Sequence, residues 1–286
     1  MKNPIKTISM GLIFILMIIM MTTCTTYGSN YGSNSTAFGP QTTNEEALWR
    51  LLSATDAVNA NLSKIVMFQV DASLALSKTG IDGPAARSIL SNLTNEDAAV
   101  IDCVTIDPNG TVHEVQPTSF ESVKGVNLLW QEHINDTINT KHYSGFYFIN
   151  AVEGIQAIDS EMPIFSENGT FLGTVSLMLN NSQFFGRVLA PYQPGGSSKI
   201  WMSKADDGTV LYEADLSQML LNKSSSMYLD YPELLKIFDR MGLERTGYAT
   251  YEFLDESHGD TIKKGCYWTT ISNDGTEMRI VLTIEL

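Results

Sequence analysis

The sequence has few of the side chains on which most enzyme active sites depend. It contains four histidines: His113, His133, His142 and His258. None stands in a His-Glu-x-x-His or Cys/His metal pattern, and no P-loop, dinucleotide-binding or Gly-x-Ser-x-Gly motif is present. Carboxylates are plentiful, but none stands out as a catalytic pair, and a solvated acidic face explains them more simply. We therefore expect a protein that is not an enzyme and that carries no metal and no cofactor.

Cysteine and basic residues are scarce as well. Beyond Cys24 only Cys103 and Cys266 are present, each in an apolar, strand-like run, so we expect two buried free thiols rather than a disulfide. The 18 Lys and Arg residues are outnumbered by 32 Asp and Glu residues, which gives a formal net charge of −14. This acidity favours solubility and argues against nucleic acid as a partner, because nucleic acid needs a basic face.

Long hydrophobic runs are limited to the N-terminus. Lys2 and Lys6 provide a positive start, and residues 8–21 then form an uncharged, mostly apolar run. Such a run is short for a bilayer span and typical of a signal-peptide core. Residues 1–23 are therefore predicted to be a signal peptide or membrane anchor.

Two alternatives for the membrane attachment remain open. Cys24 directly after the run predicts lipidation, although Thr23 stands where a smaller residue is usual; the alternative is an uncleaved anchor ending near Thr26. Both place the remaining chain outside the cytoplasm, on the outer face of the cell membrane. No second run of bilayer length follows, so we expect no transmembrane exit to a cytoplasmic output domain.

A flexible segment and two helices are predicted next. Residues 24–43 are rich in Gly, Ser and Asn, which is typical of a flexible tether. Thr43 and Glu46 match a capping box, and apolar residues then recur at helical spacing up to Gly80. We expect one long amphipathic helix over 44–79 and a shorter helix over 83–99.

The rest of the sequence contains an internal repeat of two similar units. "DPNGTVHEV" at 107–115 is matched by "ADDGTVLYE" at 205–213, and "PIFSENGTFLGTVSLML" at 163–179 by "WTTISNDGTEMRIVLTI" at 268–284. Asn-Gly and Asp-Gly between apolar runs predict hairpins, and an ordered series of matches indicates duplication. We expect an α+β fold, with a first module in 44–190, a Pro/Gly/Ser-rich linker at 191–199 and a second module in 200–286.

Glycosylation acceptor sequences are more numerous than chance predicts. Eight Asn-x-Ser/Thr sequons occur, of which Asn109 and Asn168 are equally explained as turn residues. The predicted glycosylation sites are therefore Asn34, Asn61, Asn92, Asn135, Asn180 and Asn222. This excess is typical of a surface protein.

The stretch 130–153 combines aromatic and polar residues in the proportion found in ligand pockets. Packing alone explains any single aromatic there, but the segment as a whole favours a pocket wall. The predicted ligand-binding residues are Trp130, His133, His142, Tyr143, Ser144, Phe146, Asn150 and Glu153.

The long helix followed by two hairpin-rich modules resembles the double Cache (tandem PAS-like) extracytoplasmic sensor domains. The resemblance covers about residues 44–286 and depends on the segments 104–112, 162–175, 201–212, 231–235 and 264–282, which look most like archaeal members. It implies a five-stranded antiparallel sheet flanked by helices in each module. It also implies a ligand pocket over the sheet of the first, membrane-distal module.

The sequence departs from the amino-acid-binding members of that family. Those members carry Arg-x-Trp-Tyr where this chain has Lys141-His142-Tyr143, and an Asp near the position of Asn150. Because Arg holds a ligand carboxylate and Asp a ligand ammonium, an amino-acid ligand is not expected. We predict a small-molecule sensor that signals through a separate membrane kinase, chemoreceptor or transporter. The alternatives are a structural glycosylated surface protein without a ligand and an unrecognised hydrolase.

Overall fold

A computed structural model describes residues 40–150, 156–196, 198–215, 218–219, 221–255, 260–273 and 276–286. The predicted signal peptide, Cys24 and Asn34 lie outside the described residues. In the part of the chain that is described, no helix has the length and apolar character needed to cross a membrane.

The first element is α1, a single helix over Pro40–Thr79. It begins earlier than the sequence predicted, so Thr43 lies inside the helix rather than at its cap; proline suits a first helical position because its missing N–H would be unpaired there anyway. The side chains that α1 buries recur at helical spacing: Leu51, Ala54, Val58, Leu62, Ile65, Ala72 and Leu76. This buried stripe packs on both modules, since α1 contacts β4 and β5 of the first and β9 and β10 of the second.

The first module is a five-stranded antiparallel sheet in the order β2-β1-β5-β4-β3. Its strands are β1 Val100–Ile106, β2 Val112–Gln116, β3 Tyr147–Asn150, β4 Gln156–Phe165 and β5 Phe171–Asn180. Its helices are α2 Gly83–Thr94, η1 Thr118–Val123 and α3 Glu132–Thr140. The helices α4 Asn181–Leu189 and η3 Ala190–Tyr192 then lead into the second module.

The second module repeats this topology, with strand order β7-β6-β10-β9-β8. Its strands are β6 Lys199–Lys204, β7 Val210–Tyr212, β8 Gly247–Asp255, β9 Asp260–Asn273 and β10 Thr276–Glu285. Its helices are η5 Ser226–Tyr228 and α5 Pro232–Leu243. The two matching strand orders confirm the predicted α+β fold of two tandem PAS-like modules.

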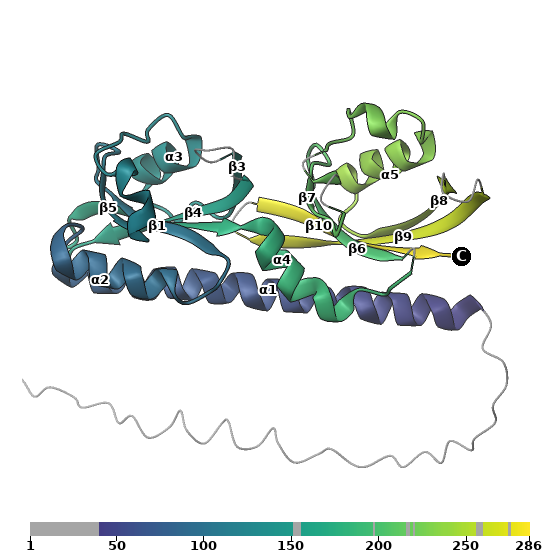
Figure 1. Ribbon diagram of the computed structural model, residues 1–286, viewed down its shortest axis with the longest axis horizontal. Helices are drawn as coiled ribbons and strands as arrows, with labels where there is room; N and C mark the ends of the chain where they lie inside the picture. The colour runs from purple at the N-terminus through teal and green to yellow at the C-terminus, as the bar shows by residue number, and fades with distance from the viewer. Residues whose placement is uncertain are drawn as a thin grey trace, which may run out of the picture. The chain divides into compact units, whose positions relative to one another are not determined.

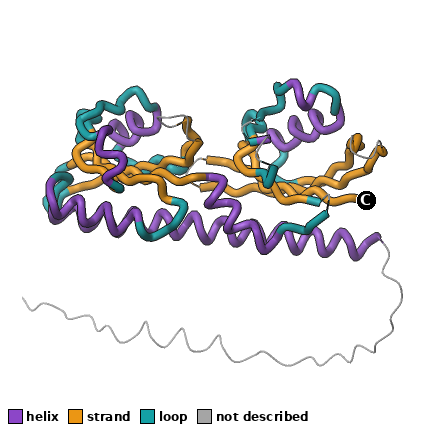
Figure 2. Tube along the Cα trace, viewed as in Figure 1, coloured by secondary structure: helices purple, strands orange, loops and turns teal. Residues whose placement is uncertain are grey.

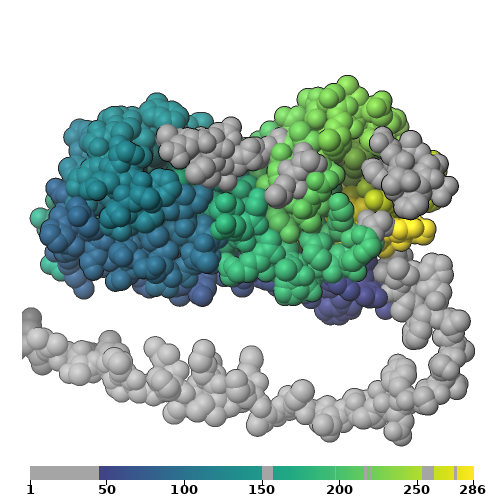
Figure 3. All heavy atoms as spheres, in the orientation of Figure 1, coloured from purple at the N-terminus to yellow at the C-terminus, as the bar shows by residue number. Residues whose placement is uncertain are grey.

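Each sheet lies between two helical layers (Figures 1 and 2). The long helix α1 runs along one face of both sheets, whereas α3 and α5 cover the opposite faces of the first and the second sheet (Figure 1). One continuous apolar core fills the α1 side of both modules, and separate clusters lie beneath α3 and α5. Seen as spheres, the α3-bearing and α5-bearing parts form two lobes (Figure 3).

The predicted hairpin at 162–179 is formed by β4 and β5. Its turn is closed by hydrogen bonds from Gly169 N to Ser166 O and from Ser166 N to Thr170 O, both 2.8 Å, and Gly169 has a φ of +81°. Gly173 is needed for a different reason: with φ at +133°, a Cβ there would lie 1.9 Å from the carbonyl oxygen of Ile106 on the neighbouring strand.

Two helix ends differ from what the sequence predicts. The helix predicted over 83–99 ends at Thr94, where the N–H of Asn95 donates to Asn92 O at 3.0 Å and the N–H of Glu96 donates to Leu93 O at 3.2 Å. Glycine commonly follows the end of a helix, but α5 continues through Gly242 to Leu243. The glycine instead allows a close approach, because a Cβ there would lie 3.3 Å from Ala205 O.

Both cysteines of the described region, Cys103 and Cys266, are buried and free, as predicted. The loop at 107–111 is a turn, with the Asp107 carboxylate accepting hydrogen bonds from the backbone N–H groups of Asn109 and Thr111. These two hydrogen bonds stabilise the turn between β1 and β2.

Candidate functional site

The face of the first sheet that lies beneath α3 carries an unusual group of acidic side chains. Successive residues of a strand point to opposite faces. Ser160 of β4 bonds to Gln69 of α1, so its neighbours Asp159 and Glu161 point away from α1. Asp102 of β1 lies near Asp159, and all three carboxylates are buried, with Glu161 fully so. We call Asp102, Asp159 and Glu161 the buried acidic cluster.

Helix α3 places an imidazole on this cluster. His133 is 2 % exposed, and its Nε2 lies 3.1 Å from Oδ2 of Asp159. The ring also stacks on Tyr147 of β3, with ring centroids 5.0 Å apart. The helix is amphipathic, and its buried side chains are His133, Ile134 and Thr137. Thus the apolar contact of α3 with the sheet holds His133 over the carboxylates.

Hydroxyl groups of β5 orient two of the three carboxylates. Ser176 Oγ donates to Oδ1 of Asp159 at 2.7 Å, and Thr174 Oγ1 donates to Oε2 of Glu161 at 2.7 Å. The second oxygen of Asp159 faces His133, whereas Oε1 of Glu161 has no hydrogen-bond partner among the described residues. A buried polar atom without a partner is uncommon in a native protein and calls for an explanation.

The electrostatics of the cluster follow from burial. Burial, reinforced by the charge of Asp159, raises the pKa of Glu161 to about 8 and that of Asp102 to about 7. Burial by itself lowers the pKa of His133, but the hydrogen bond and charge of Asp159 outweigh it and raise the pKa overall. Within the described residues, no Lys or Arg forms an ion pair with any of the three carboxylates. Apart from His133, no basic side chain of the described residues pairs with the cluster, which would therefore favour a cation.

Among the predicted site residues, His133 and Ser144 lie at this cluster. Ser144 precedes β3, and its Oγ accepts a hydrogen bond from the backbone N–H of Glu161 at 2.8 Å. Tyr143 is half-buried and meets Phe146 edge to face.

The remaining predicted residues lie elsewhere or outside the description. Trp130 is 69 % exposed, and His142 is also exposed. Phe146 is 1 % exposed and belongs to the core on the α1 side. Only the backbone of Asn150 is described, at the end of β3, and Glu153 lies outside the described residues.

The three carboxylates of the cluster were not among the predicted residues. Two of them stand in "QAIDSEMPIF", the sequence of β4, as acids two positions apart within an otherwise apolar strand. Acids at that spacing point to the same face of a strand, and acids are rarely buried without a purpose. This pattern in the sequence could have identified Asp159 and Glu161 as candidate site residues.

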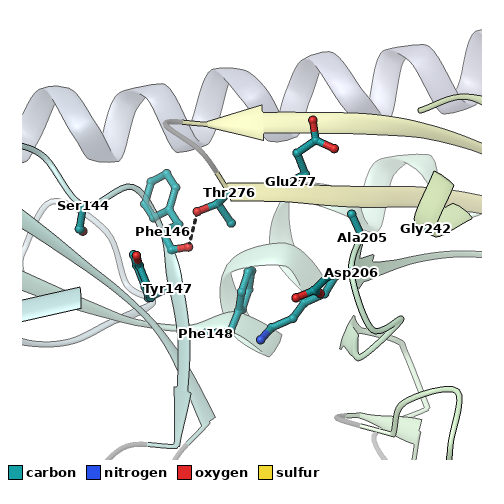
Figure 4. A pocket seen from close by; sticks show the side chains of 10 residues that line it. Ser144, Phe146, Tyr147, Phe148, Ala205, Asp206, Gly242, Thr276 and Glu277 are labelled. Carbon is teal, nitrogen blue, oxygen red and sulfur yellow. Dashed lines mark hydrogen bonds between the residues drawn. The ribbon is translucent and has the colours of Figure 1, made fainter. Parts of the chain in front are cut away.

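A concave region lies between the modules (Figure 4). It has a volume of about 540 Å³ and is lined by Ser144, Phe146, Tyr147, Phe148, Lys204, Ala205, Asp206, Gly242, Thr276 and Glu277. Thr276 Oγ1 donates to the carbonyl oxygen of Phe146 at 2.8 Å, which joins the two modules at this point. Lys204 lies over the Phe148 ring, with Nζ 5.8 Å from its centroid. The cleft is thus mixed in character and contains both charge signs.

The fold is that of extracellular ligand-binding domains of receptors. An extracellular ligand binding receptor from Desulfohalobium retbaense superposes with a TM-score of 0.68 at 29% identity, over 82% of this chain and 39% of that one. This chain therefore spans about two fifths of that receptor. The ligand-binding domain of the Pseudomonas aeruginosa amino acid chemoreceptor PctC, in complex with GABA, gives a TM-score of 0.57 at 13% identity, covering 85% and 99% of the two chains. The periplasmic sensory domain of the Campylobacter jejuni chemoreceptor Tlp1 gives a TM-score of 0.55 at 12% identity, covering 85% of this chain and 95% of that one.

A family model locates the resemblance more closely. Residues 60–181 match the model described as HK/GC/Chemotaxis protein-like, sensor domain. The matched segment includes the C-terminal half of α1 and all five strands of the first module, and so contains the whole buried acidic cluster together with His133. These comparisons agree with the predicted double Cache resemblance at the level of fold and sensor class.

Proposed function

We propose that this chain is an extracytoplasmic sensor that binds a small molecule in its first module, beneath α3. The observation that carries the proposal is the convergence of His133 with Asp102, Asp159 and Glu161 on one buried sheet face. Burying three carboxylates that share one imidazole and no Lys or Arg costs stability, and a protein retains such groups where they serve binding. The match of this module to a sensor-domain family supports the same conclusion.

The corresponding face of the second module supports this choice of site. Beneath α5 that face is filled by the side chains of Trp201, Tyr228, Phe238, Tyr251 and Trp268. The ring centroids of Trp201 and Phe238 are 5.8 Å apart, and those of Tyr228 and Phe238 are 5.3 Å apart. Packed rings occupy the space that a ligand would need, so the second module serves as a support.

The remaining sequence-based expectations belong to this proposal. Trp130, His142, Tyr143, Phe146, Asn150 and Glu153 stay predicted binding residues. A membrane attachment at residues 1–23 or through lipidated Cys24, an archaeal-type relationship and glycans on the six predicted sequons stay predictions as well. The proposed partner is a separate membrane kinase, chemoreceptor or transporter, to which the occupied domain reports.

A thermal-shift screen of the full chain tests the proposal, because a ligand that binds only the native state raises the melting temperature. The compounds are amines, carboxylates, amino acids and divalent metal salts. The variant Asp159→Asn is expected to abolish the shift, because it removes the charge that contacts His133. The matched control Asp206→Asn removes an exposed carboxylate of the cleft between the modules and should retain the shift.

Two outcomes would overturn the proposal. If Asp206→Asn abolishes the shift and Asp159→Asn retains it, the ligand binds in the cleft. If no compound raises the melting temperature, the chain has no small ligand of these classes, and the structural surface protein becomes the better interpretation.

A further inference from the structure

The buried side chains beneath α3 also form a candidate metal site. His133, Asp159 and Glu161 each offer one ligand atom, and these atoms all lie within 4.8 Å of one another. The three residues are 2 %, 5 % and 0 % exposed, respectively. Asp159 and Glu161 are two positions apart on β4 and so share a face, while α3 brings His133 from the opposite side.

We propose that this site binds a divalent transition-metal ion such as Zn²⁺ through His133 Nε2 and one carboxylate oxygen each of Asp159 and Glu161. This inference rests on the proposed function, since it names the class of ligand for the same site. It contradicts the expectation, drawn from sequence patterns alone, that the chain carries no metal.

The hydrogen bonds around the cluster fit this arrangement. Each carboxylate uses one oxygen to accept from a hydroxyl group of β5. The other oxygen of Asp159, Oδ2, faces His133, and the other oxygen of Glu161, Oε1, has no hydrogen-bond partner among the described residues. Metal-binding carboxylates are usually held by such outer hydrogen bonds, which orient them. A cation placed among the three ligand atoms would satisfy the orphaned oxygen and neutralise buried charge.

The donor set selects the kind of metal. One imidazole nitrogen with two carboxylate oxygens suits zinc and neighbouring transition metals, whereas Ca²⁺ and Mg²⁺ prefer ligand sets made of oxygen alone. The separation of 3.1 Å between His133 Nε2 and Asp159 Oδ2 is close to the ligand–ligand spacing around a tetrahedral zinc with bonds of about 2.0–2.2 Å.

Three protein ligands leave a fourth position open. In zinc sites with three protein ligands, that position is taken by water or by an exogenous small molecule. The site would therefore respond to the metal itself or to an anionic molecule bound on it.

The test is a titration of the full, chelator-treated chain with Zn²⁺ by calorimetry, and with Co²⁺ by visible absorption. The test variants are His133→Gln, Asp159→Asn and Glu161→Gln. Matched controls come from a second His–Asp pair in the same module, at the surface: His113 Nε2 lies 3.3 Å from Asp107 Oδ2, and the control variants are His113→Gln and Asp107→Asn.

We expect one zinc per chain, a tetrahedral cobalt spectrum and a loss of affinity of at least about 100-fold in each test variant, with the controls within about threefold of the unmodified chain. The inference is overturned if zinc fails to bind, or if the control pair rather than the test residues determines binding. A third outcome is that zinc does not bind, whereas an organic compound stabilises the unmodified chain but not Asp159→Asn. This outcome would reject the metal inference and support the proposed function. Glu161→Gln is isosteric, so it keeps the test valid if His133→Gln does not fold.

Discussion

The two modules share a topology but differ in what they place beneath the covering helix. In the first, the strands β1 and β4 present Asp102, Asp159 and Glu161 to α3. In the second, the strands at the same positions in the sheet, β6 and β9, present Trp201 and Trp268 to the cluster beneath α5. The fold thus tolerates either a polar or an apolar filling on this face. The filling, rather than the fold, distinguishes the binding module that we propose from the supporting one.

The sheet faces that pack on α1 are mainly apolar in both modules. Both sheets present apolar side chains to α1, and these join into one continuous core that includes Leu177 and Leu179 of the first module and Ile280 and Leu282 of the second. Because α1 buries one stripe against both sheets, that face is constrained by packing in each module. The α3 and α5 faces are where the two copies differ.

The largest effect on stability is expected in the supporting module. Trp268 is 1 % exposed, and its Nε1 donates to the carbonyl oxygen of Glu244 at 3.1 Å. Trp268→Ala should lower the free energy of unfolding by about 3–5 kcal/mol, because it leaves a large cavity and an unpaired carbonyl group. Urea denaturation measures the change. Trp49→Ala, at a position 71 % exposed, is the control and should change stability by less than about 0.5 kcal/mol.

A pH-dependent effect is expected in the binding module. The folded pKa of Asp102 is about 7, raised by burial and by Asp159 from 3.8, so this group contributes most stability below pH 4 and loses it as the pH rises through 7. In the chelator-treated chain, Asp102→Asn should therefore increase the free energy of unfolding more at pH 8 than at pH 4. The difference between the two effects should be on the order of 3 kcal/mol. Thermal unfolding across this range measures it.

Asp107 provides a control, because its effect on stability should depend on pH in the direction opposite to that of Asp102. Burial alone would raise its pKa, but hydrogen bonds from Thr111, His113 and Asn109 outweigh it and lower the pKa. Asp107 therefore contributes stability above its unfolded pKa and loses it as the pH falls. Asp107→Asn should destabilise at neutral pH and have no effect in strong acid, and a response in the same direction as that of Asp102→Asn would contradict the electrostatic explanation.

A smaller effect on stability is expected at Gln69, which bonds to the α1-facing side of β4. Gln69 of α1 is fully buried; its Nε2 donates to Ser160 O at 2.9 Å, and its Oε1 accepts from Ser160 Oγ at 2.8 Å. Gln69→Leu should cost about 1–3 kcal/mol in urea denaturation, because it leaves the Ser160 hydroxyl without a partner. Adding Ser160→Ala should recover part of that loss, and no recovery would mean that the pair does not join α1 to β4.

The smallest effect on stability is expected at Glu161. Since its pKa is raised to about 8, the carboxyl group is mainly neutral at pH 7 and an amide replaces it closely. Glu161→Gln should change the free energy of unfolding of the chelator-treated chain by less than about 1 kcal/mol. A much larger loss would assign Glu161 a structural role and remove the contrast with Trp268.

Much of the fold could be predicted from the sequence because its signals are local. Asn168-Gly169 specifies a turn, the apolar spacing of α1 specifies a helix, and the repeated phrases specify two copies of one module. The passage of α5 through Gly242 could not be predicted, because the close approach of this glycine to Ala205 O joins segments that are distant in sequence.

The site was harder to predict because it is assembled from segments distant in sequence. His133 was found from the composition of 130–153, but its partner Asp159 lies 26 residues away, in the strand that precedes the hairpin turn. That hairpin carries two of the three acids on one face and the bond to Gln69 on the other. Only the pairing of the strands and the placement of α3 show that the acids converge.

Hydrogen exchange of the full chain, with and without the strongest stabiliser from the thermal-shift screen, tests most directly whether binding belongs to the first module. Exchange should slow in α3 and β4, where His133, Asp159 and Glu161 lie, and remain unchanged in the segments that carry Trp201 and Trp268. Slower exchange beneath α5 with none beneath α3 would contradict the division of roles between the two modules.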